Sequence, residues 1–121
     1  MLSLTRRGSR TKFRLSPLRP LTLGSDPVAC DVVLDEYQGI EPCHAILLHD
    51  TDQSAYLEVL SGHATVHYED LPTVGIRVEA GHSLTLYPGD ELKLGNWVAV
   101  LKDTAVPDAP LTTSPRQGGA A

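Results

Sequence analysis

Short runs in which hydrophobic and polar residues alternate follow one another from the N-terminus to about residue 101. Alternation with a period of two residues is typical of a β-strand with one buried face. The runs predicted as strands are 2–5, 13–15, 21–23, 32–34, 45–48, 55–59, 64–68, 75–78, 83–86, 91–94 and 97–101. Glycine, proline and serine residues separate them, and Gly95-Asn96 between the last two runs is a strong signal for a two-residue hairpin turn.

No window longer than about ten residues has the 3.6-residue period of an amphipathic helix. The pattern therefore predicts an all-β sandwich of about ten short, mainly antiparallel strands. Ala45-Ile46-Leu47-Leu48 is continuous enough to predict a strand that is buried on both faces. With 121 residues the chain is expected to form one domain over residues 1–105. Residues 106–121, VPDAPLTTSPRQGGAA, are expected to be a flexible linker or tail.

Charge is distributed unevenly along the chain. Residues 1–19 contain six cations and no acid, whereas there is no lysine or arginine between Arg19 and Arg77. Cationic donors are needed to hold a phosphate or a nucleic acid, so the surface built by this cation-free stretch is expected to meet a partner protein. Its ten carboxylates are Asp26, Asp31, Asp35, Glu36, Glu41, Asp50, Asp52, Glu58, Glu69 and Asp70.

The basic N-terminal segment has two interpretations. Its cations form either an edge that approaches anionic lipid headgroups or an acidic neighbour, or a solvated strand pair attracted to the acidic body of the same fold. The segment has no apolar stretch of a signal peptide after its charges, and no run of the chain is long enough to span a bilayer. A cytoplasmic or cytoplasm-facing location is the default expectation.

Candidate catalytic and metal-binding chemistry is sparse. The sequence has no nucleophile elbow, zinc-protease motif or phosphate-binding loop. His63 and His67 would share one strand face, but two ligands without a third make a weak metal site. Cys30 and Cys43 are expected to be reduced and structural, and His44 to hydrogen-bond loop backbone. We therefore expect no enzyme activity, no metal and no cofactor.

Three motifs in order resemble the forkhead-associated (FHA) domain over residues 21–101. They are Leu23-Gly24 with Asp31-Val32-Val33-Leu34, then His44-Ala45, then Gly89-Asp90-Glu91-Leu92-Lys93-Leu94-Gly95. The resemblance implies a β-sandwich of the SMAD/FHA type, in which Gly24, His44 and Thr65 occupy structural motif positions.

The phosphothreonine-reading positions of that family are altered in this chain. Ser25 stands where the family has Arg after the Gly, and Glu41-Pro42 stands where it has Ser-Arg. The Ser-x-Asn-Gly-Thr loop becomes Ser61-Gly62-His63-Ala64-Thr65. A phosphate needs charge-assisted donors, and Glu41 would stand beside it as a like charge. The degenerate site implies that phosphothreonine is not bound; a phosphothreonine-peptide-binding signalling module is the alternative.

A narrower resemblance is to the N-terminal cytoplasmic domain of YscD/PscD/HrpQ-type proteins, inner-membrane ring components of bacterial type III secretion systems. The residues that carry it are Gly24-Ser25-Asp26-Pro27, Ile40-Glu41-Pro42-Cys43-His44 and Asn96-Trp97-Val98-Ala99-Val100.

The narrower resemblance implies a scaffold on the cytoplasmic side of the inner membrane. It would contact a sorting-platform subunit and neighbouring ring subunits, form a homo-oligomer in the full-length ring and be monomeric as a fragment. It would bind no nucleic acid, and a transmembrane helix after the linker would be its one membrane anchor. The expected partner contacts are the loops 24–31 and 35–42, with Asp26, Asp31, Asp35, Glu36 and Glu41.

Overall fold

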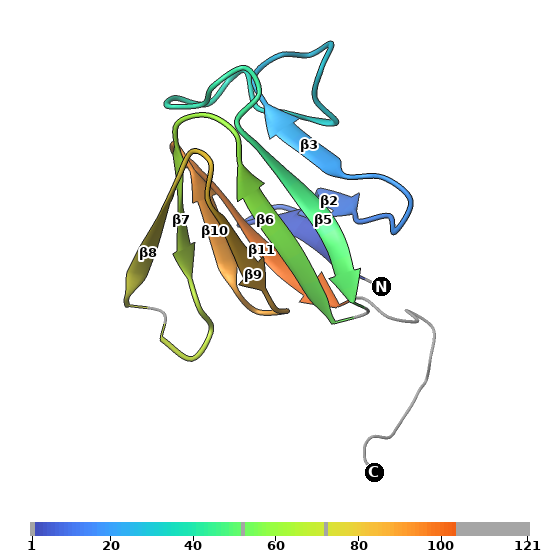
Figure 1. The fold of residues 1–121 in the computed structure, drawn as a ribbon, viewed down its shortest axis with the longest axis vertical. Coiled ribbons are helices and arrows are strands. Elements are labelled where there is room, and N and C mark those ends of the chain that lie inside the picture. The colour runs from blue at the N-terminus through green and yellow to red at the C-terminus, as the bar shows by residue number, and fades with distance from the viewer. Residues whose placement is uncertain (1, 52, 72, 104–121) are drawn as a thin grey trace.

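Two β-sheets pack face to face in the computed structural model, which describes residues 2–51, 53–71 and 73–103 (Figure 1). The alternating runs become strands because alternate side chains of an extended chain point to opposite faces, so one face can be buried. The strands are β1 (Leu2–Arg6), β2 (Lys12–Arg14), β3 (Leu21–Gly24), β4 (Val32–Val33), β5 (Ala45–Thr51), β6 (Ser54–Val59), β7 (His63–His67), β8 (Gly75–Glu79), β9 (Ser83–Leu86), β10 (Glu91–Leu94) and β11 (Trp97–Asp103).

One sheet has six strands in the order β2-β1-β11-β10-β7-β8, and the other has five in the order β4-β3-β5-β6-β9. All neighbouring strands are antiparallel except β3 and β4, which are parallel. The predicted all-β sandwich is therefore confirmed. The expected tail, residues 106–121, lies outside the described residues.

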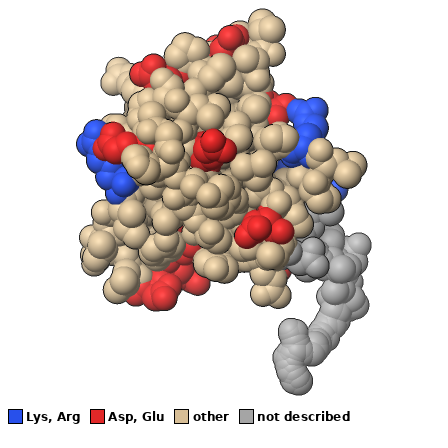
Figure 2. All heavy atoms as spheres, in the orientation of Figure 1, with Lys and Arg blue, Asp and Glu red and all other residues tan. Residues whose placement is uncertain are grey.

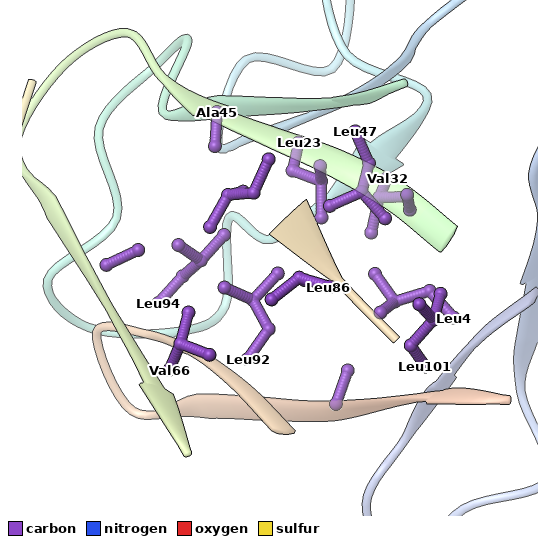
Figure 3. Close-up of a cluster of buried hydrophobic side chains, with 14 of the residues drawn as sticks. Leu4, Leu23, Val32, Ala45, Leu47, Val66, Leu86, Leu92, Leu94 and Leu101 are labelled. Atoms are coloured by element: carbon purple, nitrogen blue, oxygen red, sulfur yellow. The ribbon is translucent and has the colours of Figure 1, made fainter. Parts of the chain in front are cut away.

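The core lies between the two sheets and is built mainly from leucine and valine (Figure 3). Leu23 and Leu47 from one sheet face Leu92 and Leu94 from the other, and each of these side chains is fully buried. Trp97 at the start of β11 is the largest buried side chain. Each fully buried leucine stabilises the fold by about 2 kcal/mol relative to an exposed one, so this core fixes the sandwich.

Two features of the fold differ from simple expectation. Burial along β5 alternates, with Ala45 and Leu47 buried and Ile46 and Leu48 only half-buried, so the prediction of a strand buried on both faces is wrong. The physical reason is the two-layer architecture, which covers one face of each sheet and leaves the other at the surface. A second feature is the turn at Ser61-Gly62, which carries the chain from β6 in one sheet to β7 in the other.

Connections between the sheets bring several loops to one end of the sandwich. The segments 25–31, 34–44, 60–62 and 95–96 meet there through backbone hydrogen bonds, and we call them the loop cluster. The connection between β7 and β8 and the turn between β5 and β6 lie at the other end (Figure 1). In the described part of the chain no helix has the length and apolar character needed to cross a membrane.

Candidate functional site

The loop cluster is anchored where β3 ends against the chain after Glu41. The Ser25 N–H donates to the Glu41 carbonyl at 3.0 Å, and the Asp26 N–H donates to the Pro42 carbonyl at 3.2 Å. A Cβ on Gly24 would lie only 2.1 Å from the Pro42 carbonyl oxygen. The close approach of these two backbones thus requires glycine, which explains why glycine precedes Ser25.

His44 is a buried hub that joins three segments of the cluster. Its Nδ1 accepts from the Glu41 N–H at 3.0 Å, and its Nε2 lies 2.7 Å from the His63 carbonyl oxygen. Because Nδ1 is an acceptor, Nε2 carries the ring proton and donates to that carbonyl. The His44 carbonyl accepts from the N–H groups of Leu60 and Ser61. His44 therefore makes the loop-backbone hydrogen bonds that the sequence predicts.

Glu41 projects toward the turn between β6 and β7. The Ser61 hydroxyl donates to Glu41 Oε1 at 3.5 Å, and a Cβ on Gly62 would lie 3.1 Å from Glu41 Cγ. Ser25 reaches the same place through its backbone bond to Glu41. The loop cluster thus brings Ser25, Glu41, Pro42 and Ser61 together, and the backbone carbonyl of His63 joins them through His44.

A second carboxylate of the cluster, Asp31, is tied down rather than free. Its Oδ2 accepts from the Thr22 N–H at 3.1 Å and the Thr22 hydroxyl at 3.0 Å, and Arg19 forms an ion pair with Oδ1. The Thr22 backbone N–H has the largest effect on Asp31 and lowers its pKa. Burial, the next largest effect, opposes it, but hydrogen bonds from Arg19 and the Thr22 hydroxyl also favour the carboxylate, so the pKa stays below its ordinary value. Asp31 is therefore a stabilising residue and a poor candidate for partner contact.

Asp26, Asp35 and Glu36 differ in whether their carboxylates already have a partner within the described residues. Asp26 Oδ1 accepts from the Val28 N–H at 2.9 Å and shapes its own turn. Asp35 and Glu36 are exposed and form no ion pair within the described residues. Of the predicted contact carboxylates, Asp35, Glu36 and Glu41 thus remain available to a partner.

Two arginines from the basic N-terminal segment reach the edge of the cluster. Arg19 is engaged by Asp31, and the Arg6 guanidinium lies 5.5 Å from the centre of the Tyr37 ring, a cation–π contact. Within the described residues, neither arginine forms a hydrogen bond or an ion pair with Ser25, Ser61 or His63. The centre of the cluster is acidic and these cations lie at its border.

Both cysteines lie in the cluster as free thiols, Cys30 half-buried and Cys43 exposed. The Cys30 thiol donates to the Pro42 carbonyl at 3.1 Å. Burial, and then the nearby Cys43, raise the pKa of Cys30 above its ordinary value. A thiol with a raised pKa is a weak nucleophile, which fits a structural role better than a catalytic one.

The turn between β10 and β11 closes the cluster from the other sheet. The Gln38 N–H donates to Asn96 Oδ1 at 2.9 Å, and the Asn96 N–H donates to the Gln38 carbonyl at 3.1 Å. Gly95 has φ +56°, and a Cβ there would lie 2.0 Å from the Gln38 carbonyl oxygen. Sequence reasoning identified this turn but not its docking on Gln38, because a contact over fifty-eight positions leaves no local signal.

The side chains of other candidate residues lie on the outer face of the six-stranded sheet. Thr65 is on the outer face of β7, paired with Lys93 and Arg77 in the neighbouring strands. His63 and His67 lie on that same outer face, as two residues four apart on a strand should. Within residues 2–51, 53–71 and 73–103 no group of three or more histidine, cysteine or carboxylate residues is placed to hold a metal ion.

Known proteins resemble the chain in sequence and in fold. A model of the FHA domain family matches residues 21–95, more than half of the chain. The FHA domain of the CT664 protein from Chlamydia trachomatis is 26% identical, with a TM-score of 0.68 over 86% of this chain and 98% of that one. No curated protein sequence matches the chain.

Two further solved structures, each less similar in sequence, share the fold. The N-terminal FHA domain of Rad53p from S. cerevisiae, in complex with a phosphothreonine peptide, is 20% identical with a TM-score of 0.65, over 84% of this chain and 91% of that one. The FhaA FHA domain, complexed with the intracellular domain of Rv3910, is 19% identical with a TM-score of 0.64, over 84% and 100%.

Proposed function

The chain belongs to the FHA domain family, and on this premise we propose that it is a non-enzymatic protein-contact domain that does not read phosphothreonine. FHA domains are interaction modules, and their peptide-reading residues lie on loops. In this chain the corresponding residues converge in the loop cluster. The cluster keeps the scaffold of a recognition site while its chemistry is altered.

The observation that carries the proposal is the position of Glu41. Its carboxylate lies beside Ser61 and Gly62, in the centre of the cluster, and no lysine or arginine of the described residues forms an ion pair with it. A phosphate brought to this place would meet a like charge, which costs several kcal/mol, and would find no guanidinium to offset that cost. A neutral or basic protein surface meets no such penalty.

We place this contact domain in the inner-membrane ring of a bacterial type III secretion system, on its cytoplasmic side. The support is the resemblance of Gly24-Ser25-Asp26-Pro27 and Ile40-Glu41-Pro42-Cys43-His44 to the YscD/PscD/HrpQ-type proteins. The likeness to a bacterial FHA domain from Chlamydia trachomatis agrees with that resemblance. In such a ring, many copies present the same loops, so that weak contacts with a sorting-platform subunit gain avidity.

The test is charge reversal in the full-length protein in its own bacterium. We expect the triple variant Asp35→Lys, Glu36→Lys and Glu41→Lys to abolish recruitment of the cytosolic platform and secretion, while the domain stays folded. The matched control is Asp50→Lys, Glu69→Lys and Asp70→Lys, three exposed carboxylates at the opposite end of the sandwich. This control should leave secretion intact.

Two outcomes would contradict the proposal, at different levels. Secretion that persists after deletion of the whole protein would exclude a role in the secretion ring. The other outcome is secretion that is lost on deletion but unchanged in the triple variant. That result would support a role in the ring but exclude the loop cluster as the contact surface.

The alternative function is a phosphothreonine-reading module, favoured by the likeness in fold to the Rad53p domain in complex with its phosphothreonine peptide. Ser25 and Ser61 remain as hydroxyl donors in the cluster. Calorimetry with a phosphothreonine peptide library separates the two functions. We expect no binding; micromolar binding that disappears on dephosphorylation would establish the alternative.

A further inference from the structure

The outer face of the six-stranded sheet gathers cations that are far apart in the sequence. Residues next to the buried leucines of each strand point away from the core, because successive side chains alternate. Of the lysines and arginines in the described residues, all but Arg6, Arg10 and Arg19 are on this face, which we call the basic face. Its members are Arg7, Lys12, Arg14, Arg77, Lys93 and Lys102.

Strand register makes this a continuous surface. Ser3 of β1 is flanked by Arg14 on one side and Lys102 on the other. Thr65 of β7 lies between Lys93 and Arg77 in the same way. The six strands span about 24 Å at the usual strand spacing, so the cations are spread across a broad and gently twisted face.

Most of the positive charge of the basic face is uncompensated. Arg7 pairs with Glu91 at 3.3 Å, and Arg77 pairs with Glu79. Lys12, Arg14, Lys93 and Lys102 form no ion pair with any carboxylate in the part of the chain that the structure describes. The attraction of the N-terminal cations to the acidic body of the same fold thus accounts for Arg7 and Arg19 but not for Lys12 and Arg14.

Two hydroxyl groups under the cations lack partners. Ser3 and Thr5 point outward, yet they are only 3% and 6% exposed, and neither Ser3 Oγ nor Thr5 Oγ1 has a hydrogen-bond partner in the described residues. The cross-strand neighbours of Ser3 are Arg14 and Lys102, and those of Thr5 are Lys12 and Val100. Lysine and arginine typically lay their aliphatic stems along a sheet surface and extend their charged heads toward solvent. Oxygens of an anionic ligand that drew the heads aside would give both hydroxyls a partner.

The opposite side of the molecule has a different charge. Figure 2 views the sandwich with β5 and β6 of the five-stranded sheet in front, and carboxylates are scattered over this side while lysine and arginine appear only at its edges. The chain as a whole carries a net charge of −5. Salt screens exposed charges beyond about 8 Å at physiological ionic strength. The face that lies next to a charged surface therefore determines whether the molecule is attracted to it or repelled. An anionic surface would therefore attract the basic face and repel the other.

We infer that the basic face binds the anionic lipid headgroups of a bilayer surface. This goes beyond the proposed protein contact, which uses a different part of the molecule. Three of the four unpaired cations are lysines, compact point charges that suit a diffuse anionic field better than bidentate recognition of one carboxylate. The outward residues of the described strands in this sheet include no phenylalanine, tyrosine or tryptophan. The face thus lacks both a stacking platform for nucleic-acid bases and an aromatic anchor for a protein hot spot.

The test is co-sedimentation of the protein with vesicles at physiological ionic strength. Phosphatidylcholine vesicles containing phosphatidylglycerol are compared with vesicles of phosphatidylcholine alone. Each cation near an anionic surface raises the partition coefficient about fivefold, so the double variant Lys93→Gln and Lys102→Gln is expected to bind roughly 25-fold more weakly. Both side chains are exposed, and the variant should fold normally.

The matched control is Arg6→Gln with Arg19→Gln, which removes the same charge from outside the basic face. This control variant should bind the anionic vesicles as strongly as the unchanged protein does. Added salt should release both proteins from the vesicles. Equal binding to the two vesicle types, no binding at all, or equal weakening by control and test variants would overturn the inference. The inference would also be overturned if the protein bound duplex DNA but not the anionic vesicles, and the lysine variant lost the DNA binding. The charge-reversed loop variant should bind vesicles normally, so failure here and failure of the proposed function are distinguishable.

Discussion

Single residues in the loop cluster are constrained by backbone that approaches within contact distance. Gly24 has ordinary backbone angles, and its requirement for glycine comes from the Pro42 carbonyl oxygen facing its α-carbon. Gly95 combines both constraints, a left-handed backbone and the Gln38 carbonyl. Sequence alone identifies these glycines as turn residues, while the structure shows that they also permit two loops to touch.

Replacing Gly24 by alanine tests the close approach of β3 and Pro42. The added methyl group would overlap the Pro42 carbonyl, so we expect Gly24→Ala to lower the free energy of unfolding by about 2–3 kcal/mol in urea denaturation. The control is Gly8→Ala, whose methyl group would meet no atom within 4 Å and which bears only the cost of its φ of +76°. A smaller loss for Gly24→Ala than for Gly8→Ala would contradict the interpretation.

Asp31 makes stability depend on pH. Its pKa is lowered in the folded state, so its charged form stabilises the fold above the unfolded pKa of about 3.8, and this contribution is lost as pH falls through the lower folded pKa. We expect Asp31→Asn to cost about 1 kcal/mol near neutral pH, allowing for solvent screening, and progressively less below pH 4. Denaturation curves across that range, with Asp35→Asn as the unpaired control, measure the difference. A cost that is constant with pH would refute this role.

At the scale of elements, strand positions followed from the alternation of residues, whereas the sheet to which each strand belongs did not. The predicted runs match the observed strands closely, as for Ser83–Leu86 and Glu91–Leu94. The crossing from β6 to β7 and the half-exposed residues of β5 depend on which layers face each other, and alternation does not encode that choice. The same holds for the basic face, which needs the register of strands from both ends of the chain.

The β10–β11 turn provides a test of how elements hold the loop cluster. Asn96→Ala removes the acceptor of the Gln38 N–H, so we expect a loss of about 1 kcal/mol and faster hydrogen exchange at the Gln38 amide. Asn96→Asp keeps an acceptor oxygen at the same position and should retain most of the protection. Unchanged exchange at Gln38 in the alanine variant would show that the side chain does not hold this loop.

At the scale of the whole molecule, the loop cluster and the basic face occupy different parts of one domain. The family fold and the convergence of the loops are properties of the structure, while the loss of phosphothreonine binding stays a prediction from the substituted residues. The FHA resemblance located the substituted residues in the sequence. In the structure, one of them, Glu41, lies beside Ser61 and Gly62. Sequence reasoning missed the Arg6–Tyr37 and Gln38–Asn96 contacts, because each joins residues that are far apart in the chain.

Restoring the family residues tests whether the substitutions explain the altered site. We expect the triple variant Ser25→Arg, Glu41→Ser and Pro42→Arg to gain affinity for phosphothreonine peptides, because it adds two guanidinium groups and removes a like charge. The backbone carbonyls of residues 41 and 42, which hold the cluster, are unchanged by these substitutions. Calorimetry against the same unphosphorylated peptides measures the gain; a folded variant that binds neither form would show that the loops themselves have lost the recognition geometry.

Alternation, turn residues and charge are local properties of the chain, so they are enough to locate the strands, the turns and the cation-free stretch between Arg19 and Arg77. Tertiary contacts, in contrast, bring Arg6 and Arg19 to the border of the loop cluster, bind Asp31 to Thr22 and join later lysines to the N-terminal cations on one face. These outcomes depend on which strands pair and which loops share an end of the sandwich. Burial of the two inner faces selects that arrangement, and burial is a property of the whole fold.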